Sequence, residues 1–191
     1  LPQFEGLPDS LELPVLLKTG DDVSTDEILP AGADVLPYRS NIPAISEFTF
    51  TRIDPSYPER ARKYQDSGSM IVGGDNYGQG SSREHAALTP RYLGVRVVLA
   101  KSYARIHWEN LCNFGILPLN FTGKKDYEDI EQGDELALEG LHEALDSGKE
   151  ITARNSRTGE RYKLDHNLSP RQVRMILKGG LLNVMRESLA S

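Results

Sequence analysis

The stretch GGDNYGQGSSREHAAL (residues 73–88) joins two segments of different character. Its first glycines end MIVGG at 70–74, a compact apolar run that is typical of a buried strand. Its last residues begin a run of helix formers, and we expect a helix over about 82–88. Glycine permits positive φ angles and a close approach of the backbone to a ligand. Four glycines between a strand and a helix therefore predict a loop shaped for binding.

The segments on either side of this stretch alternate between strand and helix patterns. VLLK at 15–18, VRVVLA at 95–100 and ILPLNF at 116–121 predict three further strands. SYARIHWENLCNFG at 102–115 predicts a helix with Gly115 as its C-cap. Strands that alternate with helices form parallel βαβ units. We therefore expect an α/β fold with a central, mostly parallel sheet flanked by helices.

The two ends of the chain differ from this centre. Three prolines within residues 1–14 indicate a linker from preceding domains, so the domain is expected to cover 15–191. Alternating runs on both sides of Arg157-Thr158-Gly159 predict a hairpin. Ser169, followed by a proline, predicts the start of a closing helix. The C-terminal section should therefore be rich in β-structure and end in a helix.

A long segment without periodicity, STDEILPAGADVLPYRSNIP at 24–43, precedes the glycine-rich stretch. Because it is rich in proline and glycine, we interpret it as a functional loop with one short helical turn. PERARKYQD at 58–66 starts with proline and continues in helix formers, which predicts a short exposed helix.

Composition argues against several classes of partner. The formal net charge of −6 is a poor match for a surface that neutralises many phosphates, so we expect no nucleic-acid partner. No segment approaches the roughly 18 apolar residues of a membrane helix, so we expect no membrane partner. No basic and apolar leader precedes the first strand, and we expect a cytoplasmic protein.

Residues that bind metals are few. Cys112 is the one cysteine, and its apolar surroundings, NLCNFGIL, are typical of a buried side chain. The histidines show no HxH or HxxxH spacing, so we expect no metal site built from this chain alone; they are His85, His107, His142 and His166. For His85 we expect a hydrogen bond within its helix or to a neighbouring loop, and for His107 a packed position.

The polar part of the glycine-rich stretch admits two interpretations. Its spacing fits neither GxGxxG nor GxxxxGK[ST], so nucleotide binding is a poor fit. In the structural interpretation, Ser81 or Ser82 caps the helix and Glu84 completes a capping box. In the functional interpretation, the positive potential of the helix start and of Arg83 holds a carboxylate and lowers the cost of an ionised serine.

Two charged residues of the 24–43 segment, Asp26 and Arg39, are candidates for the same site, although each alone is more typical of a solvated surface charge. The motifs GDNYGQGSSREHAALTPRYLG, KSYARIH, NFGILPL and TDEILPAG resemble the aconitase family of hydro-lyases, and within it the C-terminal swivelling domain. The resemblance covers nearly the whole chain from about residue 15. It implies a swivelling β/β/α domain.

The resemblance also implies a role for each candidate residue. Ser81 would be the general base that removes the proton beside a carboxylate. Ser82 and Arg83 would bind a substrate carboxylate and stabilise the ionised serine. Asp26 matches the aspartate of the family's TD motif, an active-site residue, and Arg39 matches a substrate-binding arginine.

Partners, cofactor and reaction follow from the same resemblance. In the family, this domain packs over N-terminal domains that hold a four-iron, four-sulfur cluster on three cysteines, with a tricarboxylate substrate in between. Because those cysteines are absent here, the chain alone would be inactive. The expected reaction isomerises citrate to isocitrate through cis-aconitate. A homoaconitase, a methylcitrate dehydratase and a 3-isopropylmalate dehydratase remain alternatives, as does an RNA-binding regulator, against which the acidic charge counts.

Overall fold

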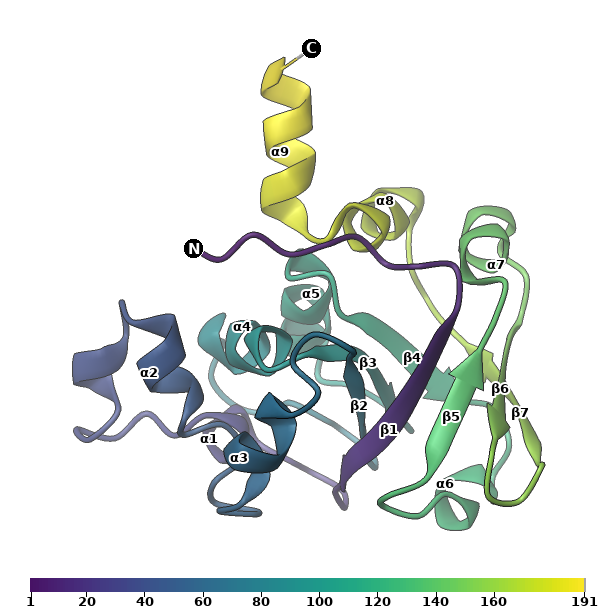
Figure 1. Ribbon diagram of the computed structural model, residues 1–191, viewed down its shortest axis with the longest axis horizontal. Coiled ribbons are helices and arrows are strands. Elements are labelled where there is room, and N and C mark those ends of the chain that lie inside the picture. Colours follow the sequence, from purple (N-terminus) through teal and green to yellow (C-terminus); the bar gives the residue numbers. More distant parts are fainter. Residues whose placement is uncertain (191) are drawn as a thin grey trace.

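A closed barrel of seven strands forms the centre of the computed structural model, which describes residues 1–190 (Figure 1). The strands are β1 (Leu11–Lys18), β2 (Ser69–Val72), β3 (Val95–Ala100), β4 (Leu117–Phe121), β5 (Glu135–Leu138), β6 (Ile151–Asn155) and β7 (Arg161–Asp165). Strands β1 to β4 are parallel to one another, whereas β5 to β7 pair antiparallel. The order around the barrel is β1-β2-β3-β4-β7-β6-β5, and β5 closes it against β1.

This closure corrects the expectation of a central, mostly parallel sheet flanked by helices, with a β-rich C-terminal section. The parallel part of the sheet is as expected, but β7 pairs with the end of β4 through Asn120↔Asp165 and Phe121↔Leu164. On the other side, β5 pairs antiparallel with β1. The C-terminal strands therefore complete the first sheet instead of forming a second one. Closure removes both free edges, whose unpaired N–H and C=O groups would otherwise need water.

The N-terminal segment belongs in part to the barrel domain. Strand β1 begins at Leu11, so residues 11–14 pair within the barrel and are not linker. Upstream, Leu7 is buried, and the Arg91 guanidinium donates to the backbone carbonyl of Glu5 at 3.0 Å. The sequence pattern placed the start of the domain too late, because Pro14 is compatible with a strand in which its missing N–H is not required.

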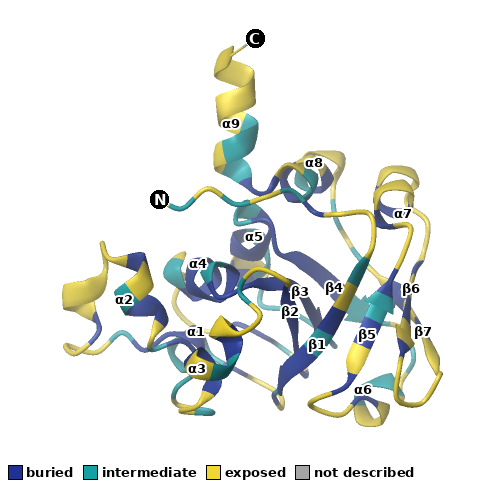
Figure 2. Ribbon diagram, in the orientation of Figure 1, coloured by how far each residue is buried: buried dark blue, intermediate teal, exposed yellow. Residues whose placement is uncertain are grey.

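Helices pack on the barrel, and strands β2 and β3 beneath them are buried (Figure 2). The barrel wall separates the buried apolar residues into two cores. One core fills the barrel interior, and the other lies between its outer face and the helices; in β3, Val97 belongs to the first and Val98 to the second. This division follows from the alternation of side chains along a strand. The helices are α1 (Thr25–Ile28), α2 (Ile42–Ser46), α3 (Tyr57–Arg62), α4 (His85–Tyr92), α5 (Arg105–Asn113), α6 (Asp126–Asp129), α7 (Leu141–Ser147), α8 (Pro170–Lys178) and α9 (Leu181–Ala190), with a 3-10 turn η1 (Leu36–Tyr38).

Helix α4 begins later than the sequence pattern indicates. It starts at His85, its N-cap is Glu84, and no side chain caps it, so the capping box of the structural interpretation does not form. The residues before it are held elsewhere: Thr25 donates from its hydroxyl to the carbonyl of Ser81 at 2.8 Å. Because this contact draws the chain toward α1, both serines stay outside the helix.

Other boundaries are confirmed, apart from that of α5. Ser169 caps α8 and forms a capping box with Gln172, and Gly179 at φ +94° ends that helix. For α5 the prediction is one residue off: its C-cap is Phe114, and Gly115 follows it with φ +77°. Strands β6 and β7 form the expected hairpin.

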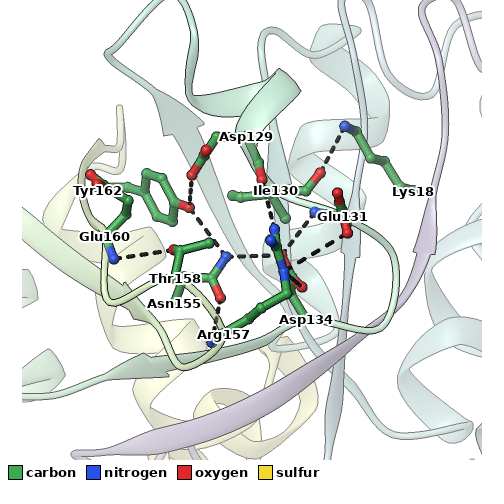
Figure 3. A network of polar contacts seen from close by, with 10 residues as sticks. All are labelled: Lys18, Asp129, Ile130, Glu131, Asp134, Asn155, Arg157, Thr158, Glu160 and Tyr162. Atoms are coloured by element: carbon green, nitrogen blue, oxygen red, sulfur yellow. Dashed lines mark hydrogen bonds and ion pairs between the residues drawn. The ribbon is translucent and has the colours of Figure 1, made fainter.

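A polar network, which we call the closure network, joins this hairpin to β5 and α6 (Figure 3). Asp134 accepts hydrogen bonds from Arg157 Nε at 2.6 Å and Nη2 at 3.1 Å, and from Asn155 Nδ2 at 2.8 Å. The Tyr162 hydroxyl contacts Asn155 and donates to the carboxylate of Asp129. The side chain of Asp134 is 4% exposed. The hydrogen bond from Arg157 holds the pKa of the Asp134 carboxyl well below its usual range, at about 2.

Candidate functional site

A hollow of about 560 Å³ lies between the start of α4 and the segment from α1 to α2. Its polar wall carries Arg39, Ser82, Arg83, Glu84 and His85. Its apolar wall carries Leu29, Pro30, Ala31, Val35, Leu36 and Ile45. The start of α4 contributes positive potential to this hollow through the helix dipole. The hollow therefore combines cationic groups with an apolar surface.

The glycine-rich stretch is shaped by what lies beneath it. Gly78 has φ +85°, and a Cβ at this position would lie 2.3 Å from the ring of His107 on α5. Gly80 has φ +100° and lies next to α1, where its added Cβ would be 3.5 Å from the Thr25 hydroxyl. Gly78 is thus required both by its positive φ and by the lack of space for a side chain, whereas Gly80 is required mainly by its positive φ.

The loop packs on the ring of His107 at Gly78. His107 is 2% exposed, its ring centroid lies 5.6 Å from that of Tyr77, and burial lowers its pKa to about 4. A neutral, packed imidazole is consistent with the packed position expected from the sequence. The loop above it is therefore seated on a rigid surface of α5.

The loop places the candidate base beside the hollow. Ser81 and Ser82 are both exposed, and Ser82 lines the hollow. Thr25 fixes this part of the chain twice, because its N–H donates to the carbonyl of Gln79 at 2.8 Å and its hydroxyl donates to that of Ser81. The backbone of the two serines is therefore held against α1. Neither serine side chain caps α4.

Asp26 and Arg83 meet directly, although 57 positions separate them in the chain. Arg83 Nη1 donates to Asp26 Oδ1 at 3.0 Å, and the N–H of Ala31 donates to the same oxygen at 3.1 Å. The second carboxylate oxygen of Asp26 accepts from Arg52. We call Asp26, Arg52 and Arg83 the site triad.

Arg39 lies across the hollow from this group. Its side chain is exposed, and its backbone carbonyl accepts a hydrogen bond from His85 Nε2 at 2.9 Å. The neighbouring Tyr38 ring stacks on Phe48, with centroids 5.9 Å apart. These contacts fasten the η1 turn, and the bond from His85 is the neighbouring-loop contact expected from the sequence.

The structure thus brings four of the five candidate residues around one hollow: Arg39, Ser82 and Arg83 line it, and Asp26 binds Arg83. Ser81 adjoins it as the chain neighbour of Ser82. Sequence reasoning missed Arg52 altogether, because its segment TFTRID carries no motif and lies far along the chain from both partners.

The residues of this chain do not fit an iron–sulfur cluster. Cys112 is buried in the barrel core, and burial raises the pKa of its thiol to about 12, which disfavours the thiolate that a metal requires. Within residues 1–190, no group of three or more His, Cys, Asp or Glu side chains is placed to hold a metal ion. Over the same range, no helix has both the length and the apolar character needed to cross a bilayer.

A mixed α/β barrel with a glycine-rich loop beside a serine and arginine hollow is the architecture that the comparisons place among the C-terminal domains of hydro-lyases. Residues 46–124 match the family model for the aconitase C-terminal domain. The 3-isopropylmalate dehydratase small subunit of Aquifex aeolicus is 38% identical, over 91% of this chain and 94% of that protein. The chain belongs to the aconitase C-terminal domain family, in agreement with the resemblance in its motifs.

Two further relatives show that proteins containing this domain differ in length. A putative mitochondrial aconitate hydratase of Emericella nidulans is 39% identical over 97% of this chain, and the chain spans only 26% of that protein's length. The crystal structure of 3-isopropylmalate dehydratase from Methanocaldococcus jannaschii superposes with a TM-score of 0.77 at 26% identity, covering 95% of this chain and 96% of the other. The fold is therefore that of a chain which can be a separate polypeptide or part of a longer one.

The comparisons also correct the expected location. The aconitate hydratases of Emericella nidulans and Saccharomyces cerevisiae that match this chain are mitochondrial proteins, which contradicts a cytoplasmic assignment. The expectation was wrong because it relied on the lack of a leader before the first strand, which carries no information about the location of the protein in the cell.

Proposed function

We propose that this domain supplies the general base and the carboxylate-binding groups of an aconitate hydratase that isomerises citrate to isocitrate through cis-aconitate. The observation that carries the proposal is the convergence of Arg39, Ser82 and Arg83 on one hollow, with Ser81 beside it. Two guanidinium groups from different segments fit a substrate with more than one carboxylate, because each pairs with a carboxylate in a planar, bidentate manner.

Ser81 is the proposed base. Its alkoxide would take the proton from the carbon beside a carboxylate while the hydroxyl group leaves the neighbouring carbon, which forms the double bond of cis-aconitate. Addition of water in the opposite sense would give the isomer. A serine ionises at neutral pH only at great cost, so nearby positive charge is required. Arg83 and the start of α4 supply it at this position.

The remaining residues bind and orient. The Arg39 side chain is exposed on the η1 turn and lines the hollow, and we assign it to a substrate carboxylate. Ser82 donates from its hydroxyl to the same or a neighbouring carboxylate. Asp26 cannot attract a carboxylate, and its contact with Arg83 favours a role in which it holds that arginine. Its place in the site is thus proposed to be indirect.

The cofactor is proposed to lie in other domains of the enzyme. The relatives contain this domain either within a longer aconitate hydratase or as a separate small subunit. We propose that a four-iron, four-sulfur cluster is held by the iron–sulfur domains of the same enzyme, where it would act as a Lewis acid on the leaving hydroxyl. The isolated domain would then bind and position but not catalyse.

One observation favours a second substrate. The apolar wall, with Val35, Leu36 and Ile45, offers a surface for an alkyl group, as a 3-isopropylmalate type of substrate would require. Leu36 is 57% exposed on the η1 turn next to Arg39. Discrimination between an alkyl group and a third carboxylate would rest on which of these two side chains the turn presents.

Turnover of the complete enzyme with citrate, isocitrate and 3-isopropylmalate tests both substrates. Ser81→Ala should lower turnover by about a thousandfold, since a positioned general base contributes roughly 10² to 10⁴. Ser67→Ala, at an exposed serine in the turn before β2, should leave it unchanged. Near-normal turnover of Ser81→Ala would exclude the base assignment, and the relative rates of the three acids decide the substrate class.

A further inference from the structure

We propose that Arg52 is a positioning residue of this site: it occupies one oxygen of the Asp26 carboxylate and so leaves part of the Arg83 guanidinium available to a substrate carboxylate. The inference rests on the proposed function, because it concerns the same hollow. It assigns a role to a residue outside every motif of the chain.

Both oxygens of Asp26 are engaged. Oδ1 accepts from Arg83 Nη1 at 3.0 Å and from the N–H of Ala31 at 3.1 Å. Oδ2 accepts from Arg52 Nη1. An arginine facing a free carboxylate tends to form two parallel hydrogen bonds with it. With Oδ2 taken by Arg52, Arg83 makes a single bond to Asp26. Its Nη1 also contacts the carbonyl of Leu29 at 3.5 Å, and its Nε and Nη2 groups remain for a ligand.

The charges support the same conclusion. One carboxylate and one guanidinium would cancel, whereas the site triad carries one net positive charge at the edge of the hollow. Glu84 and His85 also line the hollow, and Glu84 is an exposed carboxylate that opposes an incoming anion. The extra guanidinium of Arg52 offsets that repulsion. The side chain of Arg83 is 29% exposed, so water screens its charge less than that of a surface arginine.

The backbone that carries Arg52 is held in a sparsely populated conformation. Phe50 is fully buried and has φ +57°, which is costly for a bulky residue. Its N–H donates to the carbonyl of Ile28 at the end of α1 at 2.7 Å, and its ring meets Tyr57 edge-on at 4.9 Å. The hydrogen bond ties the turn to α1, the helix that contains Asp26, and the ring contact ties it to α3. The strained conformation therefore places Arg52 opposite the carboxylate.

The chain offers a matched control nearby. Arg62 of α3 binds the carboxylate of Glu47, and the two side chains are 43% and 49% exposed. The Arg52 and Asp26 side chains are similarly exposed, at 51% and 39%. Arg62 and Glu47 form a simple ion pair, whereas Arg52 shares its carboxylate with a second arginine. Removing Arg62 therefore removes the same kind of contact without touching the site triad.

The experiment measures kcat and KM of the complete enzyme with its carboxylate substrate. Arg52→Gln should raise KM about fivefold, with a smaller change in kcat, because roughly this ratio corresponds to one exposed ion pair. Arg52→Lys should recover most of the affinity, since it restores the charge next to Oδ2. Arg62→Gln should match the wild type. A role in folding alone would reduce the active fraction, and so kcat, at unchanged KM.

A double variant tests whether Arg52 acts through Asp26. In an Asp26→Asn background, Arg52→Gln should have no further effect on KM. The proposal is overturned if Arg52→Gln equals the wild type, if lysine restores nothing, or if the effect persists in the Asp26→Asn background. Ser81→Ala, measured in parallel, separates the two levels: retained turnover there rejects the proposed function, whereas lost turnover with a normal Arg52→Gln rejects only the role of Arg52.

Discussion

The site triad and the closure network are both built on an ion pair between aspartate and arginine, but they differ in exposure and in how the carboxylate is shared. In both, an aspartate meets an arginine that comes from a distant part of the chain. The side chain of Asp134 is 4% exposed and also accepts from an asparagine and a backbone N–H. The side chain of Asp26 is 39% exposed, and its carboxylate is shared between two arginines.

The two regions differ in whether their hydrogen-bond donors are used within the protein or remain available to a ligand. In the closure network the Asp134 carboxylate accepts from Arg157, from Asn155 and from the N–H of Glu131, and the hydrogen bond from Arg157 is the main cause of a carboxyl pKa far below its usual range. A buried carboxylate that is satisfied in this way makes the local structure rigid. In the site triad the arginines outnumber the carboxylate, so guanidinium donors are left over for an anion. The first region should therefore respond to mutation in its stability and the second in its activity.

Among the variants that test this comparison, the largest expected effect concerns Gly78, the glycine that places the site loop on His107. Gly78→Ala adds a Cβ 2.3 Å from the His107 ring at a φ of +85°, so the loop must lift away from α5. Displacement of catalytic groups by about 1 Å can cost roughly a hundredfold in rate, and we expect kcat to fall by about that factor.

Gly133→Ala is the control for this variant, in the turn before Asp134. It has φ +99°, but an added Cβ there meets nothing within 4 Å. We expect it to cost about 1 kcal/mol in stability through conformation alone and to leave kcat unchanged. Equal kcat values for the two variants would contradict the seating of the loop on His107.

The next effect concerns the closure network. Asp134→Asn removes the charge that faces Arg157 and leaves buried groups poorly paired, so we expect the free energy of unfolding to fall by about 2 kcal/mol. Urea denaturation of the wild type and the variant measures this difference. Glu47→Gln, which breaks an exposed ion pair, should change it by less than about 0.5 kcal/mol. A cost for Asp134→Asn no larger than that of the control would show that closure does not depend on this network.

Acid should remove the same contribution. The folded pKa of Asp134, at about 2, lies below its ordinary value of about 4, so the carboxylate stabilises the fold fully above about pH 4. This stabilisation is lost as the pH falls from about 4 through about 2. The difference in unfolding free energy between wild type and Asp134→Asn should therefore shrink over this interval. A difference that stays constant down to pH 2 would contradict the cause assigned to the shift.

The smallest expected effect concerns the η1 turn. His85→Ala removes the donor to the Arg39 carbonyl, so Arg39 is held less firmly and KM should rise about twofold to threefold. His142→Ala provides the control, because His142 Nε2 donates in the same way to the carbonyl of Leu7, far from the hollow. An equal KM for both variants would show that the bond from His85 has no part in binding.

The sequence identified local features well and long-range pairing poorly. The hairpin around Arg157-Thr158-Gly159 and the cap at Ser169 follow from neighbouring residues, and both are confirmed. The start of α4 was predicted three positions too early, at Ser82 in place of His85, because Thr25 competes for the residues before it. Barrel closure joins strands far apart in the chain, and no local pattern encodes such pairing.

The same division applies to the candidate site. Ser81, Ser82, Arg83, Asp26 and Arg39 lie in motifs, so the sequence by itself determined which residues to examine and the family to which the chain belongs. Only the tertiary structure decided that Asp26 faces Arg83, that Arg52 completes the site triad, and that Gly78 is required by the ring of His107. The physical reason is the range of each interaction: caps, turns and motifs depend on residues a few positions apart, whereas charge sharing and packing depend on contacts that form only once the barrel has closed.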